Sequence, residues 1–373
     1  MAARRRPQRP QAEGAQESRR ARPGFAERLL AWYDAHRRRL PWREAPGPWP
    51  TWVSEVMLQQ TRVEVVREAF ARFLDRYPGP AAFAAASDDE VLQAWRGLGY
   101  YRRARLLREG ARAVVEVHGG KVPEQHEAIA ALPGVGPYTA GAIASIAFGQ
   151  PVPAVDGNVE RVLSRHRGIS ANVKTGVGAR AVRAAATQLL ARARPGDFNQ
   201  ALMDLGAGVC TPRAPRCDAC PVGADCVARH DGRQHELPLL PTRRAAVDVH
   251  TRVAMVRDAD GRVLGRRVPA GEINGGQVDL PGPGPLVAVI DGEELQTWLD
   301  DHLGPRAVRV ALEAAGDVRH GITHHRIRVS VHHATLLRAP ASSDAVWGEP
   351  VHDDRVTWTT LARKAMQRVL SPG

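Results

Sequence analysis

Long apolar runs are missing from this 373-residue chain, and no stretch approaches the length that crosses a membrane. Residues 1–23 likewise lack the apolar segment of a signal peptide; they contain seven arginines and two glutamates. We therefore expect a soluble protein without membrane contact, located in the cytoplasm and associated with the nucleoid. The same composition predicts that residues 1–23 form a disordered basic tail, with a transit peptide as the alternative.

Acidic residues are the minority among the charged ones. The chain has 40 Asp and Glu against 52 Lys and Arg, and arginine supplies almost all of the positive charge, so that the net charge is +12. Such an excess favours a polyanionic partner whose phosphates would dominate the affinity. The alternative is a general arginine bias of the source proteome, which would concern solubility alone.

Cysteines are scarce and confined to one short segment. All four lie within seventeen residues, as Cys210, Cys217, Cys220 and Cys226. Secreted disulfide scaffolds spread their cysteines more widely, so this distribution favours a reducing compartment and a metal site. By count alone, four thiolates suit tetrahedral Zn²⁺ and a cubane iron–sulfur cluster equally well.

The chain is organised around residues 132–161, LPGVGPYTAGAIASIAFGQPVPAVDGNVER. Gly134 and Gly136 flank a single valine in a turn that we expect to be too tight for ordinary side chains at either position, and a helix of small residues follows. Free N–H groups at the start of a helix attract phosphate, so this pattern predicts an anion-binding hairpin. A proline-rich loop then brings Asp156 to the start of another helix. The alternatives are an αα-corner without a ligand and, for Asp156, a simple helix N-cap.

A second candidate carboxylate lies in an amphipathic helix predicted over residues 52–74. Glu55 has Val53, Val56 and Met57 as neighbours, and apolar surroundings disfavour the charged form of a carboxyl group. Such a group can stay protonated near neutral pH and act as a general acid; an exposed surface glutamate is the alternative. Cleavage of a glycosidic bond uses two carboxyl groups, one to donate a proton and one to stabilise the sugar cation.

Five strings together resemble the adenine DNA glycosylase (MutY) family of the helix-hairpin-helix superfamily: LPWR at 40–43, SEVMLQQT at 54–61, GLGYY at 97–101, LPGVG at 132–136 and VDGNV at 155–159. The resemblance covers residues 25–230 strongly and 245–370 weakly. It implies an all-α glycosylase core in which Glu55 is the catalytic acid and Asp156 the charged carboxylate, with Tyr138 and Asn158 assisting.

The resemblance also implies residues that handle the DNA. The pocket for the extruded base would be formed by Arg38, Leu40, Trp42, Arg43 and Asp204. The DNA-binding residues would be Gln60 and Tyr100, which wedge into the duplex, and Gly134 and Gly136 of the hairpin.

Lysine is missing from the position at which endonuclease III-type relatives carry it, and Tyr138 stands there instead. In those relatives the lysine forms a Schiff base and the DNA strand is then cleaved. The resemblance therefore implies base removal without an efficient lyase step. It also implies, from the 6-2-5 spacing of the intervening residues, that the four cysteines hold a [4Fe–4S] cluster rather than zinc.

After a linker at residues 231–246, the pattern changes to alternation, with strands expected at 252–258, 262–268 and 326–337 and helices at 292–303 and 358–370. Residues 274–281 loosely resemble an element of the MutT-like (Nudix-like) domain that closes MutY proteins. No GX5EX7REUXEE string follows, so a nucleotide pyrophosphate hydrolase is disfavoured and recognition without hydrolysis is expected. The family's 8-oxoguanine-inspecting loop would correspond to residues 319–325, with Ile322, Thr323 and His324 as the contacting residues.

The expected architecture is therefore multidomain. Residues 24–46 and 151–230 would form an iron–sulfur helical domain, residues 47–150 a helical domain with the hairpin, and residues 247–373 an α+β MutT-like domain. The expected function is excision of adenine mispaired with 8-oxoguanine or guanine in double-stranded DNA, by a monomer. An endonuclease III-like or G/T mismatch glycosylase and a non-catalytic DNA-binding protein are the alternatives.

Overall fold

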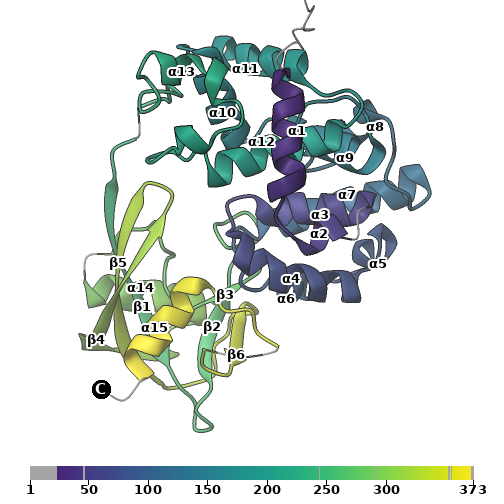
Figure 1. Cartoon of the computed structure of the whole chain (residues 1–373). Helices are drawn as coiled ribbons and strands as arrows, with labels where there is room; N and C mark the ends of the chain where they lie inside the picture. Colours follow the sequence, from purple (N-terminus) through teal and green to yellow (C-terminus); the bar gives the residue numbers. More distant parts are fainter. Residues whose placement is uncertain are drawn as a thin grey trace, which may run out of the picture.

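The computed structural model describes residues 23–44, 47–242, 244–289, 291–351, 353 and 355–370. An all-helical part is followed by a smaller domain with two three-stranded sheets (Figure 1). The expected basic tail lies outside the described residues apart from Pro23. Within these ranges no helix combines the length and the apolar content that crossing a bilayer would require.

The first helical lobe has an aromatic core in which Trp49, Trp52, Phe73 and Phe83 pack together. Trp95 is also fully buried in this core. The lobe consists of α2 (Pro41–Glu44), α3 (Pro48–Leu58), α4 (Val63–Arg76), α5 (Pro80–Ala84), α6 (Asp88–Ala94), α7 (Arg102–His118), α8 (His126–Ala130) and α9 (Pro137–Phe148).

The second helical lobe has a separate core, to which the first helix of the chain returns. Phe25, Leu29 and Tyr33 pack there with Phe198 and Leu202. The chain thus starts in one lobe, forms the other and comes back. The second lobe consists of α1 (Phe25–His36), α10 (Gly157–Arg167), α11 (Gly176–Leu189), α12 (Pro195–Gly208), the 3₁₀ helices η1 (Cys217–Ala219) and η2 (Gly223–Asp225), and α13 (Val227–His230).

The single helix predicted over residues 52–74 is wrong, because α3 ends at Leu58 and α4 begins at Val63. The main-chain oxygens of Val56 and Met57 accept hydrogen bonds from the Arg103 guanidinium, at 2.6 and 2.9 Å. A continuous helix would instead direct these oxygens to the N–H groups four residues later. The break follows from a side chain more than forty positions away.

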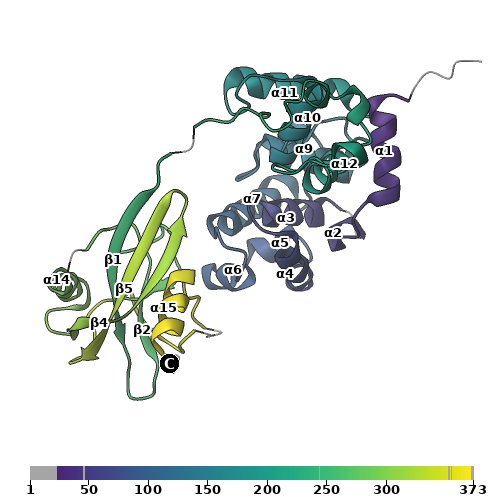
Figure 2. The same ribbon diagram turned by 60° about the vertical axis from the view of Figure 1, so that its left-hand side comes forward.

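The larger of the two sheets in the C-terminal domain has one helix on each of its faces (Figures 1 and 2). Alternate residues of β1 face opposite ways: Val253 and Met255 pack in the cluster that contains α15, and Ala254 and Val256 in the cluster that contains α14. The elements are β1 (Val247–Val256), β2 (Val263–Arg267), β3 (Val278–Asp279), α14 (Gly292–Leu303), β4 (Val308–Ile322), β5 (His325–Leu336), β6 (Ala345–Gly348) and α15 (Thr360–Leu370).

The larger sheet has the order β1-β5-β4, with β1 parallel and β4 antiparallel to β5, and the smaller has the order β3-β2-β6. The sequence did not indicate β4, an edge strand, because it lacks alternation. Bulges between Val310 and Ala314 and between Ala314 and Gly316 shift its register, so period two is lost.

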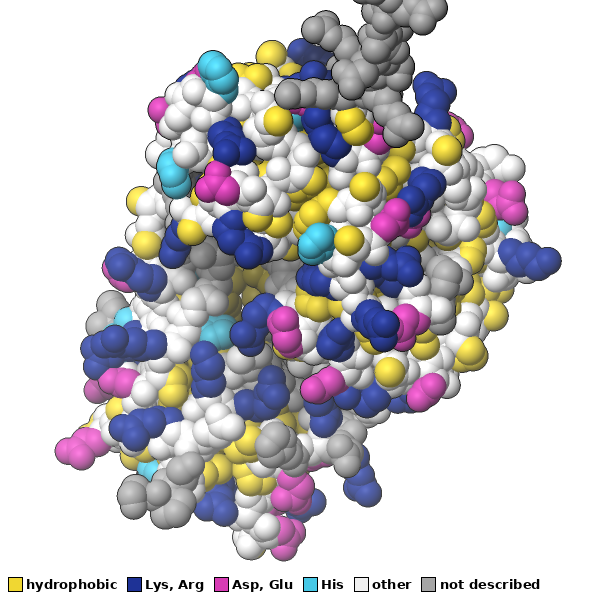
Figure 3. Space-filling model, viewed as in Figure 1, with side chains coloured by type: hydrophobic (Ala, Val, Ile, Leu, Met, Phe, Trp, Pro, Cys, Tyr) yellow, Lys and Arg dark blue, Asp and Glu magenta, His cyan; other side chains and the backbone are white. Residues whose placement is uncertain are grey.

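The two parts touch through α6, α7 and the segment between them. The guanidinium of Arg267 pairs with Asp89 at 2.9 Å, and Arg96 donates to the main-chain oxygen of Asp353 at 2.6 Å. Figure 3 shows a recess between the two parts, with Lys and Arg side chains on both of its sides.

Candidate active site

A cleft of about 810 Å³ brings most of the predicted site residues together. Its size falls within the range of ligand sites in proteins. Residues from α3, the hairpin, α9, the start of α10 and α12 line it, so both helical lobes contribute. The predicted residues on its wall are Arg38, Leu40, Trp42, Glu55, Gln60, Gly134, Gly136, Tyr138, Asp156 and Asn158.

Glu55 is a buried carboxyl group on α3, with 5% of its surface exposed. Burial raises its pKa to about 7; the Tyr138 hydrogen bond lowers the pKa, the Asp156 charge raises it and Arg43 lowers it. Near neutral pH, both protonation states of Glu55 are therefore populated. A carboxylic acid with such a pKa is suited to donate a proton to a leaving group.

Tyr138 lies in the first turn of α9, directly after the proline that begins the helix. Its hydroxyl donates a hydrogen bond to Oε2 of Glu55 and lies 3.7 Å from Sδ of Met203. Burial raises the pKa of Tyr138 well above its usual value, and the nearby charges of Glu55 and Asp156 raise it further. The phenol therefore stays protonated and acts as a fixed donor to the carboxyl group.

Asp156 caps the N-terminus of α10. Its Oδ1 accepts a hydrogen bond from the Val159 main-chain N–H and its Oδ2 accepts one from Nδ2 of Asn158, both at 2.8 Å. The N-cap alternative is thus real, and it is compatible with catalysis. N–H donors at a helix N-terminus stabilise negative charge, which is what the partner of a sugar cation requires.

The loop that delivers Asp156 is fastened by buried Asn199 on α12. Oδ1 of Asn199 accepts a hydrogen bond from the main-chain N–H of Ala154 at 3.1 Å. Nδ2 of Asn199 donates to the main-chain oxygen of Val152 at 2.9 Å and to Oγ of Ser145 at 2.8 Å. On α9, a Cβ on Gly141 would lie 2.4 Å from a main-chain oxygen of this loop. The small residues of α9 therefore let the loop pack directly on the helix, which places its carboxylate beside the cleft.

Asn158 is itself held by Arg161. One Nη of Arg161 donates to Oδ1 of Asn158 and to the main-chain oxygen of Gly206, each at 2.9 Å, and Nε donates to the main-chain oxygen of Cys210 at 2.7 Å. The amide beside Asp156 is thereby connected to the beginning of the cysteine segment.

The hairpin glycines have different roles. Gly134 has φ +75°, and a Cβ there would lie 2.6 Å from Cβ of Leu106, so this position requires glycine. Gly136 is the N-cap of α9 at φ −90°, and a Cβ there would meet nothing within 4 Å. The expectation that both are needed by the turn is wrong for Gly136, which instead leaves the helix N-terminus open.

Arg43 and Asp204 do not line the cleft with the other predicted pocket residues. Asp204 is buried, and both its oxygens are taken: Oδ1 accepts from Nε of Arg38 at 2.9 Å and Oδ2 from Nη1 of Arg43 at 2.7 Å. Asp204 therefore acts on the pocket by orienting Arg38, whose side chain does line it.

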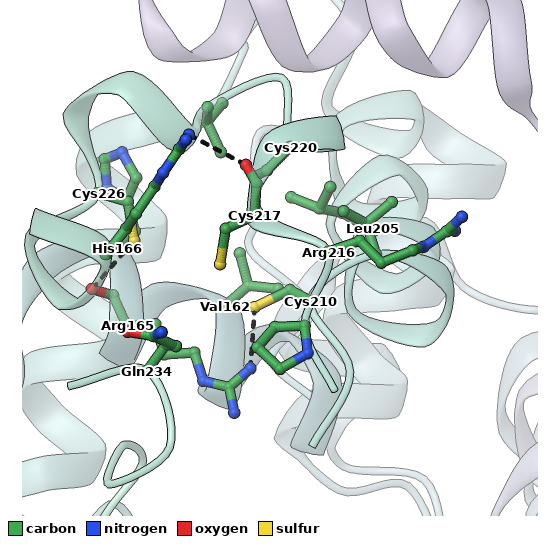
Figure 4. Close-up of a pocket in the computed structure, with 15 residues that line it drawn as sticks. Val162, Arg165, His166, Leu205, Cys210, Arg216, Cys217, Cys220, Cys226 and Gln234 are labelled. Carbon is green, nitrogen blue, oxygen red and sulfur yellow. Dashed lines mark hydrogen bonds between the residues drawn. The ribbon is translucent and has the colours of Figure 1, made fainter. Parts of the chain in front are cut away.

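The four cysteines form no disulfide with one another and lie around one cavity (Figure 4). Arg165 approaches the thiol of Cys210 at 3.4 Å, and burial raises the pKa of Cys220 to about 11. In the described part of the chain, no three Cys, His, Asp or Glu side chains converge as the ligands of one metal ion would.

The predicted lesion-contacting residues lie far along the chain, at the β4–β5 turn. Ile322 is the last residue of β4, so only Thr323 and His324 form the turn, and the expected loop over residues 319–325 is mostly strand. Thr323 has φ +54°, and its hydroxyl lies 3.4 Å from Nδ1 of His324. These residues do not line the cleft.

Comparison with known proteins places this geometry in a family. A family model described as HhH-GPD superfamily base excision DNA repair protein matches residues 53–192. Adenine DNA glycosylase of Mus musculus is 38% identical over 375 residues, covering 86% of this chain and 72% of that protein. The chain belongs to the adenine DNA glycosylase family. The Homo sapiens member is 50% identical over 222 residues, covering 57% of this chain but only 41% of that protein.

Family membership confirms the predicted class, a base-excision DNA repair enzyme with a helix-hairpin-helix glycosylase core. A solved thermostable thymine-DNA glycosylase shares the helical part, with a TM-score of 0.52 and 31% identity over 56% of this chain and 95% of that one. The α+β character of the C-terminal domain is also confirmed.

Several residues in and behind the cleft escaped sequence reasoning. Thr139 and Met203 line the cleft, and Asn199 and Arg161 support Asp156 and Asn158 from behind. Thr139 and Arg161 lie within the segment 132–161, but the sequence pattern assigned them no role. For Asn199, a polar residue among the apolar residues of α12 was an available signal, because a buried amide needs partners.

Proposed function

We propose that this protein excises adenine opposite 8-oxoguanine or guanine from double-stranded DNA by acid-assisted cleavage of the N-glycosidic bond. The observation that carries the proposal is the pair of unlike carboxyl groups on one cleft. Glu55 is buried and has its pKa raised to about 7, whereas Asp156 accepts hydrogen bonds on both oxygens. One group is equipped to give a proton and the other to carry charge.

In this mechanism, the target adenine leaves the base stack and enters the cleft, since base chemistry requires extrusion. Gln60 and Tyr100 enter the space that it vacates. Glu55 then protonates the purine, at N7 in our proposal, while Tyr138 orients its carboxyl group. As the bond breaks, the anionic Asp156 faces the developing positive charge on the sugar. A water molecule then adds to C1′ and releases a proton, which leaves an abasic sugar and free adenine.

A monofunctional reaction follows from the hydroxyl at position 138. The side chain at this position is a phenol that is hydrogen-bonded to Glu55, and a phenol has no amine with which to form a Schiff base with the sugar. We therefore expect abasic DNA, and no efficient strand cleavage, as the product.

The test is a single-turnover assay with the full-length protein on A·8-oxoguanine, A·G, G·T and thymine-glycol duplexes, each with and without alkali. Strand breaks that appear only after alkali, and only in the adenine duplexes, are expected. Release of thymine or its oxidation product would instead identify one of the alternative glycosylases. Binding without release of any base would identify a DNA-binding protein.

The excision rate should depend on pH in a definite direction. Glu55 must be protonated to act, so the rate should fall about tenfold per pH unit once the pH rises above the Glu55 pKa of about 7. The Tyr138 hydrogen bond lowers that pKa, so Tyr138→Phe should move the falling limb to higher pH. Single-turnover rates between pH 5.5 and 9 measure this; an unmoved limb in Tyr138→Phe would assign the titration to another group.

We also propose that the four cysteines hold a [4Fe–4S] cluster. The support is the 6-2-5 spacing of the four cysteines and their position around one cavity, with Arg165 supplying a positive charge beside Cys210. When bound, the cluster would cross-link the segment from Cys210 to Cys226.

Cys217→Ala should therefore lose the visible absorbance of an iron–sulfur protein and most of its bound iron. Anaerobically purified wild-type and variant proteins are compared by absorption spectrum and by iron, sulfide and zinc analysis. One zinc per chain with no iron would show that the site is a zinc site.

We further propose that the C-terminal domain is MutT-like and reads 8-oxoguanine through Thr323 and His324, beside Ile322. The support is the position of these two residues at an exposed turn with a hydroxyl and an imidazole side by side. Thr323→Ala should reduce the preference for A·8-oxoguanine over A·G severalfold and leave A·G excision unchanged. Thr335→Ala, on β5 away from this turn, is the control; equal rate ratios in all three proteins would exclude the assignment.

A further inference from the structure

The two residues that would wedge into the duplex both lie on strained turns. Gln60 has a backbone φ of +58° and Tyr100 one of +48°, values that residues other than glycine rarely adopt. Tyr100 is 57% exposed and Gln60 is exposed as well, so packing of their own side chains does not explain these conformations. Such strain persists only where the surrounding structure over-determines it.

One guanidinium holds both turns. Arg103, the second residue of α7, is half-buried and stands between the end of α3 and the turn that precedes its own helix. Its five hydrogen bonds, at 2.6 to 3.0 Å, go to the main-chain oxygens of Val56, Met57, Leu98 and Gly99 and to the Thr61 hydroxyl.

The Thr61 hydroxyl adds a direct bridge between the turns, because it also donates to the main-chain oxygen of Leu98 at 3.2 Å. The guanidinium carbon of Arg103 lies 5.5 Å from the centre of the Trp95 ring and 5.8 Å from that of Tyr100. Burial lowers the pKa of Arg103 only to about 10, so the group stays charged near neutral pH. The two Nη groups of this planar, charged side chain donate all five hydrogen bonds and so reach both turns, whereas the buried Nε has no hydrogen-bond partner among the described residues.

We propose that Arg103 is a positioning residue that locks the Gln60 turn and the Tyr100 turn into one rigid unit, so that both wedges enter the duplex together. The proposal rests on the proposed function in assigning the wedges, and it adds their coupling. The two Arg103 hydrogen bonds at the end of α3 also form the Gln60 turn. The end of the helix and the position of the Gln60 wedge therefore have the same cause.

The test measures wedge insertion separately from chemistry. An A·8-oxoguanine duplex carries 2-aminopurine beside the adenine, and Glu55→Gln protein is added at saturating concentration, so that fluorescence reports unstacking while no base is released. In this background, Arg103→Met should leave the 2-aminopurine fluorescence near the value of free DNA. With Glu55 present, it should slow single-turnover excision by about tenfold or more. Arg102→Met, which removes the neighbouring exposed charge, should leave the fluorescence increase at its full value.

Thr61→Val and Thr61→Ser provide a second comparison that does not depend on the folding of Arg103→Met. Val removes the bridging hydroxyl at equal size and should lose part of the signal, whereas Ser keeps it and should restore the signal. Full fluorescence in folded Arg103→Met, or equal signals in the two Thr61 variants, would overturn the proposal. It would also be overturned if the Glu55→Gln protein with Arg103 intact left the fluorescence of the duplex unchanged. A protein that unstacks the duplex but releases no adenine would contradict the proposed function alone.

Discussion

Glu55→Gln should abolish adenine excision while the protein still binds the A·8-oxoguanine duplex. The amide has almost the shape of the carboxyl group and can accept the Tyr138 hydrogen bond, so the cleft should keep its form. It has no acidic proton to give to the purine. General acid catalysis contributes about 10²- to 10⁴-fold, and we expect a loss of about 10³-fold or more in the single-turnover rate.

The matched control is Glu160→Gln, which makes the same change at another carboxylate on the same cleft. Glu160 forms an ion pair with Lys174 at 2.6 Å, and the proposed mechanism gives it no role in proton transfer. Its variant should excise adenine at close to the wild-type rate. Near wild-type release by Glu55→Gln, with binding checked by anisotropy titration, would show that Glu55 is not the acid.

Asp156→Asn has the second largest expected effect. Asparagine is as good an N-cap as aspartate, so α10 should keep its start and the melting temperature should be unchanged. The negative charge that faces the sugar is lost, however. Removing one preorganised electrostatic contact with a transition state typically costs about 10²- to 10³-fold, which is the expected fall in the single-turnover rate.

Asp291→Asn, at the N-cap of α14 in the other domain, is the control for capping alone. Its side chain accepts from the Glu293 and Glu294 N–H groups at 2.9 Å, which is the same local role without a cleft. Both variants should melt like the wild type, and only Asp156→Asn should lose activity. A fall in melting temperature that matches the loss of activity in Asp156→Asn would reduce Asp156 to a structural cap.

The comparison of the fold with the sequence separates local from distant causes. The helix at residues 292–303 and the strand at residues 326–337 could be predicted, because their periodicity is present in consecutive residues. The break after Leu58 and the bulged β4 could not. In these segments, contacts with residues elsewhere in the chain override the local pattern.

The candidate site divides in the same way. The sequence alone specified which groups are present: two carboxylates in unlike surroundings, a tyrosine where relatives carry a lysine, and four closely spaced cysteines. Only the tertiary structure decided how Glu55 and Asp156 meet across one cleft, and which residues hold them there. Burial, which raises the Glu55 pKa to about 7, and the Asn199 hydrogen bonds that fasten the loop before Asp156 exist only in the folded protein, whereas the hydrogen bonds on Asp156 itself are local to residues 156–159. The pKa of an ionisable group depends on its surroundings, and folding creates those surroundings.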